Sequence, residues 1–260
     1  MNCISTKNLN ISYDNVDIVK DLNLEIPKGK ITTIIGSNGC GKSTILKTIA
    51  RIIKSKSGDI FINDKSIKEQ KAKDIAKVMA VLPQSPQAPN GLTVEELIAY
   101  GRFPHQKGFG KKTNDDRDII TWALKSTHIE EFRHRKIEDL SGGQRQRAWI
   151  AMAIAQQTDI LILDEPTTYL DLAHQLEILK LLKDINLKYN TTIVMVIHEL
   201  NNAARFADNM VGIKKGEIVC EGSPEVVMTN ENLRKLFNID AEIINDSREH
   251  KPVCVTYDIV

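Results

Sequence analysis

A single glycine-rich stretch, Gly36–Thr44, constrains the fold of this chain more than any other feature. It has a glycine, four further residues and then Gly-Lys-Ser. Residues 31–35 before it are apolar and mostly β-branched, which indicates a buried strand, and residues 45–52 after it have helical spacing. A strand, a glycine loop and a helix in this order are typical of a phosphate-binding loop, because the glycines let successive N–H groups point at phosphate oxygens.

Within this loop, the side chains and the backbone have different expected roles. The N-terminus of the following helix contributes about half a positive charge. Lys42 is expected to reach the β- and γ-phosphates, and the Ser43 hydroxyl to hold Mg²⁺. A glycine turn that matches by chance is the weaker interpretation. The predicted nucleoside triphosphate site comprises Ser37, Asn38, Gly39, Cys40, Gly41, Lys42, Ser43 and Thr44.

Composition limits the partners of such a site. The chain has 260 residues, enough for one large domain or a domain with a smaller lobe, and its net charge of +1 disfavours an electrostatic nucleic-acid binder. Its four scattered cysteines indicate a reducing compartment and no zinc site. The sequence has no signal-peptide pattern and no apolar run of membrane-spanning length. We expect a cytosolic protein that reaches the membrane only through a partner.

The N-terminal residues predict an antiparallel pair of strands. Residues 3–13 and 18–26 alternate between polar and apolar, and Tyr13-Asp14-Asn15 between them is typical of a turn. Tyr13 stands at the end of the first strand. It is either an aromatic platform for a nucleotide base or an ordinary edge-strand tyrosine, and the residues alone leave both open.

After the loop helix, residues 67–76 predict another helix and residues 78–82 a buried strand. Gln84 follows that strand in a proline-bounded loop. In an α/β sheet this position faces the same edge as the glycine loop. By position alone, an ordinary loop glutamine is the favoured interpretation of Gln84.

Residues 93–132 predict helices without a convincing strand. Thr93-Val94-Glu95-Glu96 is a capping box that opens one helix, and residues 114–125 form an amphipathic second one. We expect a helical lobe inserted into the α/β chain. The aromatic and cationic loop 101–112 within it is either a docking surface or simply solvated.

A second anion site is predicted at Leu140-Ser141-Gly142-Gly143-Gln144, which precedes a helix over 145–156. Ser141 is placed as the N-cap, and the glycines leave backbone N–H groups accessible. A purely structural helix cap is the alternative.

Residues 160–163 are four consecutive large apolar residues, which indicates a strand covered on both faces. Packing does not explain the two carboxylates at its end. Asp164 is expected to hold the hydration shell of Mg²⁺, and Glu165 to face the attacking water. Residues 167–171 then form a loop that caps a helix over 172–189.

Residues 191–197 predict a third buried strand, which ends at His198. A lone histidine in this position is usually structural. His198 shares the expected sheet edge with Lys42 and Glu165, and this convergence favours a functional role. Residues 210–220 predict a hairpin, and the tail 241–260 holds one or two weak strands without a readable role.

Taken together, these motifs resemble an ATP-binding-cassette (ABC) ATPase over nearly the whole chain. The resemblance rests on Gly36–Thr44, Gln84, Leu140–Gln144, Ile160–Glu165, Leu170-Asp171 and His198. It implies an α/β fold: a P-loop NTPase, RecA-like core with an antiparallel β subdomain and an inserted α-helical subdomain. The implied boundaries are one cassette over 1–260, with a helical subdomain at 87–157.

The resemblance also assigns a role to each matching residue. It implies that ATP and Mg²⁺ are the cofactors and that Gln84, Glu165 and His198 form the catalytic group. In detail, it implies adenine stacking by Tyr13, phosphate binding by Lys42 and the loop amides, Mg²⁺ coordination by Ser43, Gln84 and Asp164, base catalysis by Glu165 and γ-phosphate sensing by His198.

The partners follow from the same resemblance. In the family, two cassettes pack head to tail, and the ATP held by one is covered by the other. The covering residues implied here are Ser141, Gly142, Gly143, Gln144 and Asp171. A second copy of the chain, an integral membrane permease and, indirectly, an extracellular or periplasmic substrate-binding protein are the implied partners, without nucleic acid. The implied location is the cytoplasmic side of the cell membrane.

Three segments point to one branch of the family. Thr167–Asp171, His198–Asn201 and Gly101–His105 resemble ATPase subunits of ferric-siderophore importers, in the group that also serves haem and vitamin B12. The likeness is greatest to ferric-hydroxamate uptake. The alternatives are a cassette of another importer or exporter, or a soluble ABC ATPase in DNA repair or translation. This last class usually has a long coiled-coil insertion or a second cassette, which the sequence lacks.

Overall fold

The computed structural model describes residues 1–13, 16–106 and 113–260, which form two compact units. The first comprises residues 1–70 and 185–260, and the second residues 71–184. The predicted turn at Asp14-Asn15 and much of the expected loop 101–112 lie outside the described residues. The two units are described separately below.

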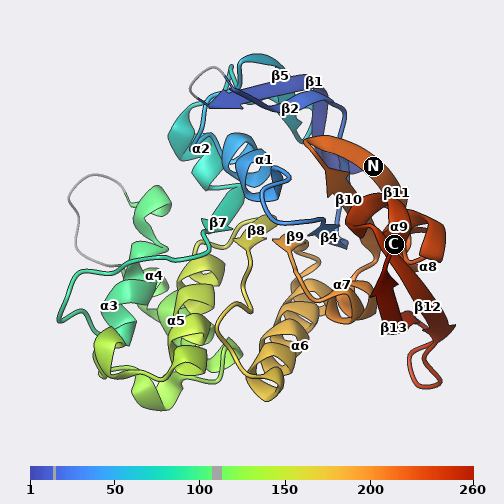
Figure 1. The fold of residues 1–260 in the computed structure, drawn as a ribbon. Helices are drawn as coiled ribbons and strands as arrows, with labels where there is room; N and C mark the ends of the chain where they lie inside the picture. Colours follow the sequence, from blue (N-terminus) through green and yellow to red (C-terminus); the bar gives the residue numbers. More distant parts are fainter. Residues whose placement is uncertain (14–15, 107–112) are drawn as a thin grey trace. The chain divides into compact units, whose positions relative to one another are not determined.

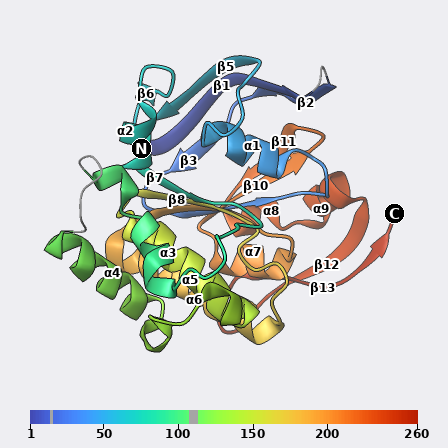
Figure 2. The same ribbon diagram turned by 90° about the vertical axis from the view of Figure 1, so that its left-hand side faces the viewer.

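The first unit contains an antiparallel sheet with the strand order β2-β1-β5-β6, and β3 pairs with β1 (Figure 2). This confirms the predicted N-terminal pair. The expected strand 18–26 is two strands, because Leu22 pairs with Leu9 whereas Ile26 pairs with Ile4. The strands are β1 (Asn2–Tyr13), β2 (Val16–Leu22), β3 (Glu25–Pro27), β5 (Ser57–Ile62) and β6 (Lys65–Ser66).

A second sheet of this unit is mainly parallel and has the order β11-β10-β4-β9. Every residue of β4 and β9 is buried, as their unbroken apolar and β-branched sequences predict. Helices α1 (Lys42–Ile49) and α7 (Leu200–Phe206) follow β4 and β9 along the chain. The strands are β4 (Ile31–Ile35), β9 (Thr192–Val196), β10 (Asn209–Lys214) and β11 (Glu217–Gly222).

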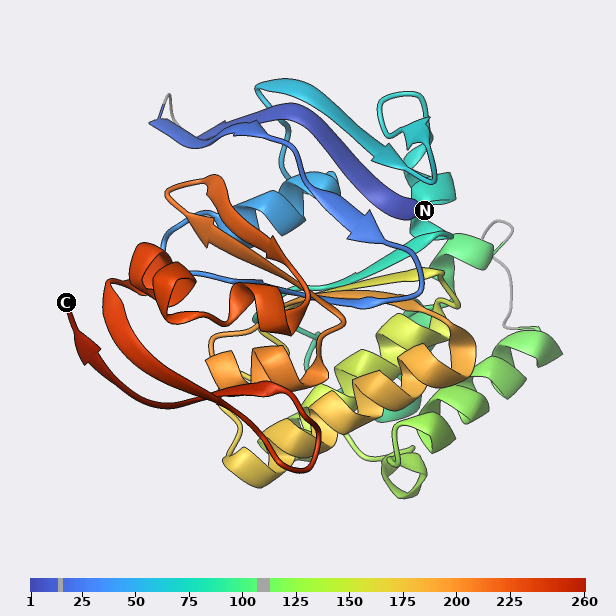
Figure 3. The same cartoon turned by 90° about the vertical axis from the view of Figure 1, so that its right-hand side faces the viewer.

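The C-terminal tail forms a hairpin of β12 (Ile239–Asn245) and β13 (Pro252–Ile259) (Figure 3). Two short helices, α8 (Pro224–Val227) and α9 (Asn230–Phe237), precede it. The Asn201 side chain on α7 makes two hydrogen bonds to the backbone of Cys254, accepting from its N–H at 2.8 Å and donating to its carbonyl at 3.1 Å. These bonds fasten the hairpin to α7.

The second unit begins with α2 (Ala72–Ala76) and β7 (Met79–Leu82). β7 pairs in parallel with β8 (Ile160–Asp164), which comes later in the chain. The prediction of a helix over 67–76 was wrong in its first half. Ile67 is still part of the β5–β6 turn region, because its N–H donates to the carbonyl of Ile60 at 2.9 Å. Only residues 72–76 are helical.

The helices of the second unit include α3 and α4, which both pack on α5 (Figure 1). Capping boxes open α3 at Thr93, α4 at Thr113 and α5 at Ser141. Between residues 93 and 132 the described chain contains helices and no strand, as predicted. The helices are α3 (Val94–Tyr100), α4 (Asn114–Ser126), α5 (Gly142–Ala155) and α6 (Leu172–Tyr189), whose last turn belongs to the first unit.

A buried ion pair joins these helices. Nε of Arg102 lies 2.9 Å from Oδ1 of Asp116, and the two side chains are only 7% and 9% exposed. The guanidinium also donates to the carbonyl of Ala155 at 2.7 Å. Burial opposes ionisation of Asp116, but hydrogen bonds from Arg102 and Thr113 hold the pKa of its carboxyl below its ordinary value. The pair therefore ties the end of α3, the start of α4 and the end of α5 together.

Among the residues that the structure describes, no helix has both the length and the apolar character needed to cross a membrane.

Candidate functional site

The glycine loop (residues 36–44) lies at the carboxyl end of β4 and runs directly into α1. Gly36 has φ = 151°, and a Cβ at this position would lie 2.2 Å from the carbonyl oxygen of Ile213 on β10. Gly41 has φ = 106° and precedes the first turn of α1. The local backbone therefore requires both glycines. Gly36 leaves no room for a Cβ beside the Ile213 carbonyl, and Gly41 has a positive φ that glycine adopts without strain.

The turn between β10 and β11 supports the same loop. The N–H of Gly216 donates to the carbonyl of Cys40 at 2.9 Å. Gly216 has φ = 80°, and a Cβ there would lie 2.0 Å from the carbonyl oxygen of Ile18. The path of the glycine loop is thus fixed by backbone atoms from β2 and from the β10–β11 turn.

Lys42 is buried, with 5% of its surface exposed, although it carries a charge. Its ammonium donates to the carbonyls of Gly36 at 2.8 Å and Ser37 at 2.9 Å, and lies 3.8 Å from Sγ of Cys40. These bonds hold the cation over the loop, while residues 37–39 are exposed and Ser43 and Thr44 half-buried. A loop with an inward cation and an accessible backbone can receive phosphate oxygens.

His198 shares the sheet edge of this loop. β4 and β9 are parallel neighbours in which Ile34 pairs with Val196. Gly36 and His198 each follow two residues after that pair, so the expected placement of His198 at the sheet edge of the glycine loop is confirmed. His198 is exposed. Its role as a sensor stays a prediction.

Tyr13 is the last residue of β1 and is half exposed. Its expected position at a strand end is confirmed. The choice between a platform for a base and an edge-strand tyrosine stays open from this geometry.

In the second unit, Gln84 and Glu165 are in contact. β7 and β8 are parallel, and Leu82 pairs with Leu163, so the two residues follow this pair in equivalent positions. Nε2 of Gln84 donates to Oε2 of Glu165 at 2.5 Å. The Thr168 hydroxyl donates to the same oxygen at 3.0 Å. These two donors orient the carboxylate, and Thr168 is a positioning group that sequence reasoning missed.

Asp164, one residue earlier, is the last residue of β8 and is 4% exposed. The expected Mg²⁺ donors, Ser43, Gln84 and Asp164, provide a hydroxyl, an amide and a carboxylate, which are the hard oxygen ligands that this cation prefers. Mg²⁺ commonly keeps several waters and needs few carboxylates. No cluster of three or more His, Cys, Asp or Glu side chains that could hold a metal occurs in the described parts of the chain. The oxygen donors of Ser43, Gln84 and Asp164 thus fit Mg²⁺.

Ser141 of the cap segment (residues 141–144) is the N-cap of α5, as predicted, but the helix begins at Gly142 and not at Arg145. The Ser141 hydroxyl accepts a hydrogen bond from the N–H of Gln144 at 3.4 Å, and the Gln144 side chain accepts from the N–H of Ser141 at 3.1 Å. Ser141 and Gly142 are exposed, whereas Gly143 is buried. The segment therefore presents a hydroxyl and the start of a 14-residue helix at the surface.

Asp171, the last residue of the Asp171 loop (residues 167–171), contacts the ring of His174, which the sequence did not reveal. Oδ1 of Asp171 accepts from the backbone N–H of His174 at 2.9 Å and pairs with its ring nitrogen Nδ1 at 2.8 Å. The N–H bond, followed by the ring, holds the pKa of the Asp171 carboxyl below its ordinary value. An N-capping signal at Asp171 is visible in the sequence, but the ring contact is not.

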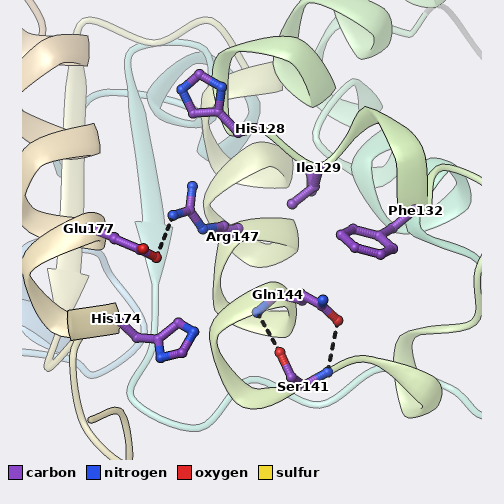
Figure 4. Close-up of a pocket in the computed structure, with 8 residues that line it drawn as sticks. All are labelled: His128, Ile129, Phe132, Ser141, Gln144, Arg147, His174 and Glu177. Atoms are coloured by element: carbon purple, nitrogen blue, oxygen red, sulfur yellow. Dashed lines mark hydrogen bonds and ion pairs between the residues drawn. The ribbon is translucent and has the colours of Figure 1, made fainter. Parts of the chain in front are cut away.

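A hollow of about 320 Å³ opens beside the cap segment (Figure 4). Arg147 and Glu177 form an ion pair of 2.8 Å in its wall. The lining residues are His128, Ile129, Phe132, Ser141, Gln144, Arg147, His174 and Glu177.

Known proteins resemble the chain over most or all of its length. A family model described as ABC transporter matches residues 19–168. The iron(3+)-hydroxamate import ATP-binding protein FhuC of Bacillus subtilis (strain 168) is 60% identical over 260 residues, which cover 100% of this chain and 97% of that relative.

Solved structures agree with this family. A chain from an inward-facing metal-chelate type ABC transporter has a TM-score of 0.84 and 30% identity, covering 98% of this chain and 96% of its own. The dimeric ATP-binding cassette MJ0796, bound to ADP and Pi, has a TM-score of 0.74 and 29% identity, with 85% and 98% covered. The predicted fold class is thereby confirmed. The chain belongs to the ABC transporter family and is one of its ATP-hydrolysing cassettes.

Proposed function

We propose that this chain is the ATP-hydrolysing subunit of an importer for iron(III)–siderophore complexes, with ferric hydroxamates as the favoured class. The observation that carries this proposal is the full-length similarity to the iron(3+)-hydroxamate import protein. The exporter, DNA-repair and translation alternatives have no comparable support. The cargo itself is selected by other proteins of the importer, so this chain contributes the motor.

The proposed chemistry is hydrolysis of the γ-phosphate by an oriented water. Glu165 is the group that orients the water and accepts its proton, because its carboxylate is already held by Gln84 and Thr168. His198 contacts the γ-phosphate, and Lys42 exchanges its loop carbonyls for phosphate oxygens. Ser43, Gln84 and Asp164 would hold Mg²⁺, which would supply positive charge to neutralise the phosphates. Tyr13 stacks on the adenine.

The second half of each site comes from another copy of the chain. Ser141 and Gly143 are expected to cover the ATP that the partner's glycine loop holds, and Asp171 to cross the interface beside them. The exposed hydroxyl and helix start of the cap segment support this role. The dimeric cassette among the similar structures supports the same arrangement.

The partners at the membrane are an integral permease and, indirectly, a substrate-binding protein outside the membrane. We propose that the whole chain is one cassette and that its helical subdomain, residues 87–157, meets the permease at the cytoplasmic face. The side chains of Tyr100 and Phe103 support this proposal, since they are 53% and 71% exposed. Between them, Arg102 anchors the segment through its buried pair with Asp116.

The substitution Glu165→Gln tests the hydrolytic role. We expect ATP binding to persist and turnover to fall by roughly 10²–10³-fold or more, the loss seen when one positioned catalytic group is removed. Steady-state phosphate release and an ATP titration measure the two effects. Near-normal turnover would remove Glu165 from the role of base.

A growth experiment tests the cargo class. Deletion of the gene should abolish growth on a ferric hydroxamate as sole iron source and leave growth on a simple ferric salt intact. Co-purification with a membrane-embedded permease is expected, and recovery with ribosomes or DNA instead would favour the soluble alternative.

A further inference from the structure

His174 occupies the first turn of α6 and makes contacts in two directions. Toward the Asp171 loop, its backbone N–H and its ring nitrogen Nδ1 both reach Oδ1 of Asp171. The backbone bond is the ordinary N-cap interaction of α6, in which Asp171 accepts from a main-chain N–H, so any residue with such an N–H at position 174 could make it. The ring bond is additional, and because a carboxylate can only accept, Nδ1 is the nitrogen that carries the proton.

Toward the cap segment, the same ring lies against Gly143. A Cβ at Gly143 would be 2.6 Å from Cδ2 of His174, closer than any real side-chain contact. The ring thus occupies the space that a larger residue at 143 would need. Figure 4 shows the ring facing the turn that carries Ser141 and Gln144.

The other carboxylate that lines the hollow does not compete for the ring. His128, Arg147 and Glu177 also line the hollow beside the cap segment, but Glu177 is paired with Arg147 at 2.8 Å. Asp171 is therefore the acidic partner of the His174 ring. The two bonds lower the pKa of the Asp171 carboxyl, as expected for donors that favour its ionised form.

We propose that His174 is a positioning residue that joins the Asp171 loop to the cap segment, so that both meet the partner copy's ATP as one preformed surface. This inference rests on the proposed function, in which both segments cover that ATP. His174 itself touches no nucleotide. Its effect is to remove the independent motion of two surface segments, which reduces the ordering that pairing of two copies requires.

ATP-driven pairing of two copies is the property to measure. Each variant is placed in the Glu165→Gln background so that ATP is not consumed, and the half-association concentration is read by light scattering. We expect His174→Ala to raise this concentration by about tenfold, because two segments that are no longer held together must then be ordered when the copies pair. ATP affinity below the association concentration should change less than about twofold, since the residue acts on pairing alone.

Two further variants separate the two contacts. His174→Asn keeps an amide donor for Asp171 but loses the ring against Gly143, whereas His174→Phe keeps a ring and loses the donor. Each should pair better than His174→Ala and worse than the parent. His134→Ala removes a histidine whose side chain is 83% exposed elsewhere in the same unit, and serves as the matched control.

The outcomes are distinct. If His174→Ala pairs like its parent, or if either Asn or Phe restores pairing completely, His174 does not join the two segments and the inference is wrong. If the Glu165→Gln parent itself fails to pair with ATP, the shared site of the proposed function fails, and this inference fails with it.

Discussion

The glycine loop and the cap segment are both predicted to bind one triphosphate, yet they are built in opposite ways. Backbone atoms enclose the glycine loop: Gly36 touches the carbonyl of Ile213, and Gly216 donates to Cys40. Its lysine is buried. The cap segment exposes Ser141 and Gly142 and is held by side-chain hydrogen bonds of Ser141 and Gln144.

The contrast separates a permanent half-site from one that acts by meeting another molecule. A loop walled by backbone cannot yield to a new side chain, since backbone carbonyls do not rotate away. A surface held by side chains tolerates substitution but loses its preformed geometry. We therefore expect substitutions that press on this backbone in the first region to weaken ATP binding strongly, and those in the second region to weaken pairing.

The strongest test of this contrast is Gly36→Ala. The added Cβ meets a backbone oxygen at 2.2 Å in a positive-φ conformation, so strain and overpacking should together lower ATP affinity by roughly 1,000-fold or more. Gly39→Ala is the matched control, because it has positive φ but no atom within 4 Å of a Cβ. Gly39→Ala should weaken the free energy of ATP binding by no more than about 2 kcal/mol. A fluorescent-nucleotide titration compares the ATP affinities of the two variants. Equal losses of affinity would show that the contact of residue 36 with the Ile213 carbonyl is not what limits substitution.

A smaller effect is expected from Arg102→Met, and on stability rather than binding. It leaves Asp116 buried without its partner charge, which should lower the free energy of unfolding by about 3 kcal/mol. Arg117 is exposed on α4, the helix that carries Asp116. Arg117→Met should change the free energy of unfolding by less than about 0.5 kcal/mol. Denaturant titration followed by circular dichroism measures both. A comparable loss in the two variants would contradict the role of the buried pair.

Acid should remove part of the same stabilisation. Because the folded pKa of Asp116 lies below its unfolded value, its contribution is complete above the unfolded pKa of about 3.9 and is lost as the pH falls through the folded pKa. The stability difference between the wild type and Asp116→Asn should therefore be constant near neutral pH and shrink below about pH 4. Denaturant titrations at several pH values test this, and a difference that grows in acid would have the wrong sign.

The smallest effect compares two helix caps. Ser141→Ala and Thr93→Ala each remove a capping box and should each lower stability by about 1 kcal/mol. Only Ser141→Ala should also weaken ATP-driven pairing, because Thr93 opens a helix outside the proposed interface. Thermal unfolding and light scattering report the two properties. Equal pairing by both variants would leave Ser141 with a structural role alone.

Local patterns allowed much of this fold to be predicted. The apolar runs at 31–35 and 160–163 are in buried strands, and the capping signals at Thr93 and Ser141 are helix N-caps as expected. These features depend on residues within a few positions of one another, so the sequence contains the necessary information. Parallel pairing then explains why Gln84 meets Glu165.

Features that depend on distant residues could not be predicted. The ring of His174 against Gly143 and the ion pair of Arg102 with Asp116 join segments that are separated along the chain. Helix 67–76 was predicted too long because Ile67 bonds back to Ile60 in a strand turn. The weak strands of the tail pair as a hairpin, which Asn201 of α7, about 50 residues earlier in the chain, bonds at Cys254.

The packing of Gly36 against the Ile213 carbonyl also has a consequence for biosynthesis. The glycine loop leaves the ribosome early, but Ile213 and Gly216, which shape it, follow more than half a chain later. During translation the loop therefore exists for some time without its enclosing backbone. A nascent chain cannot acquire its mature nucleotide cradle until β10 and the turn after it have emerged.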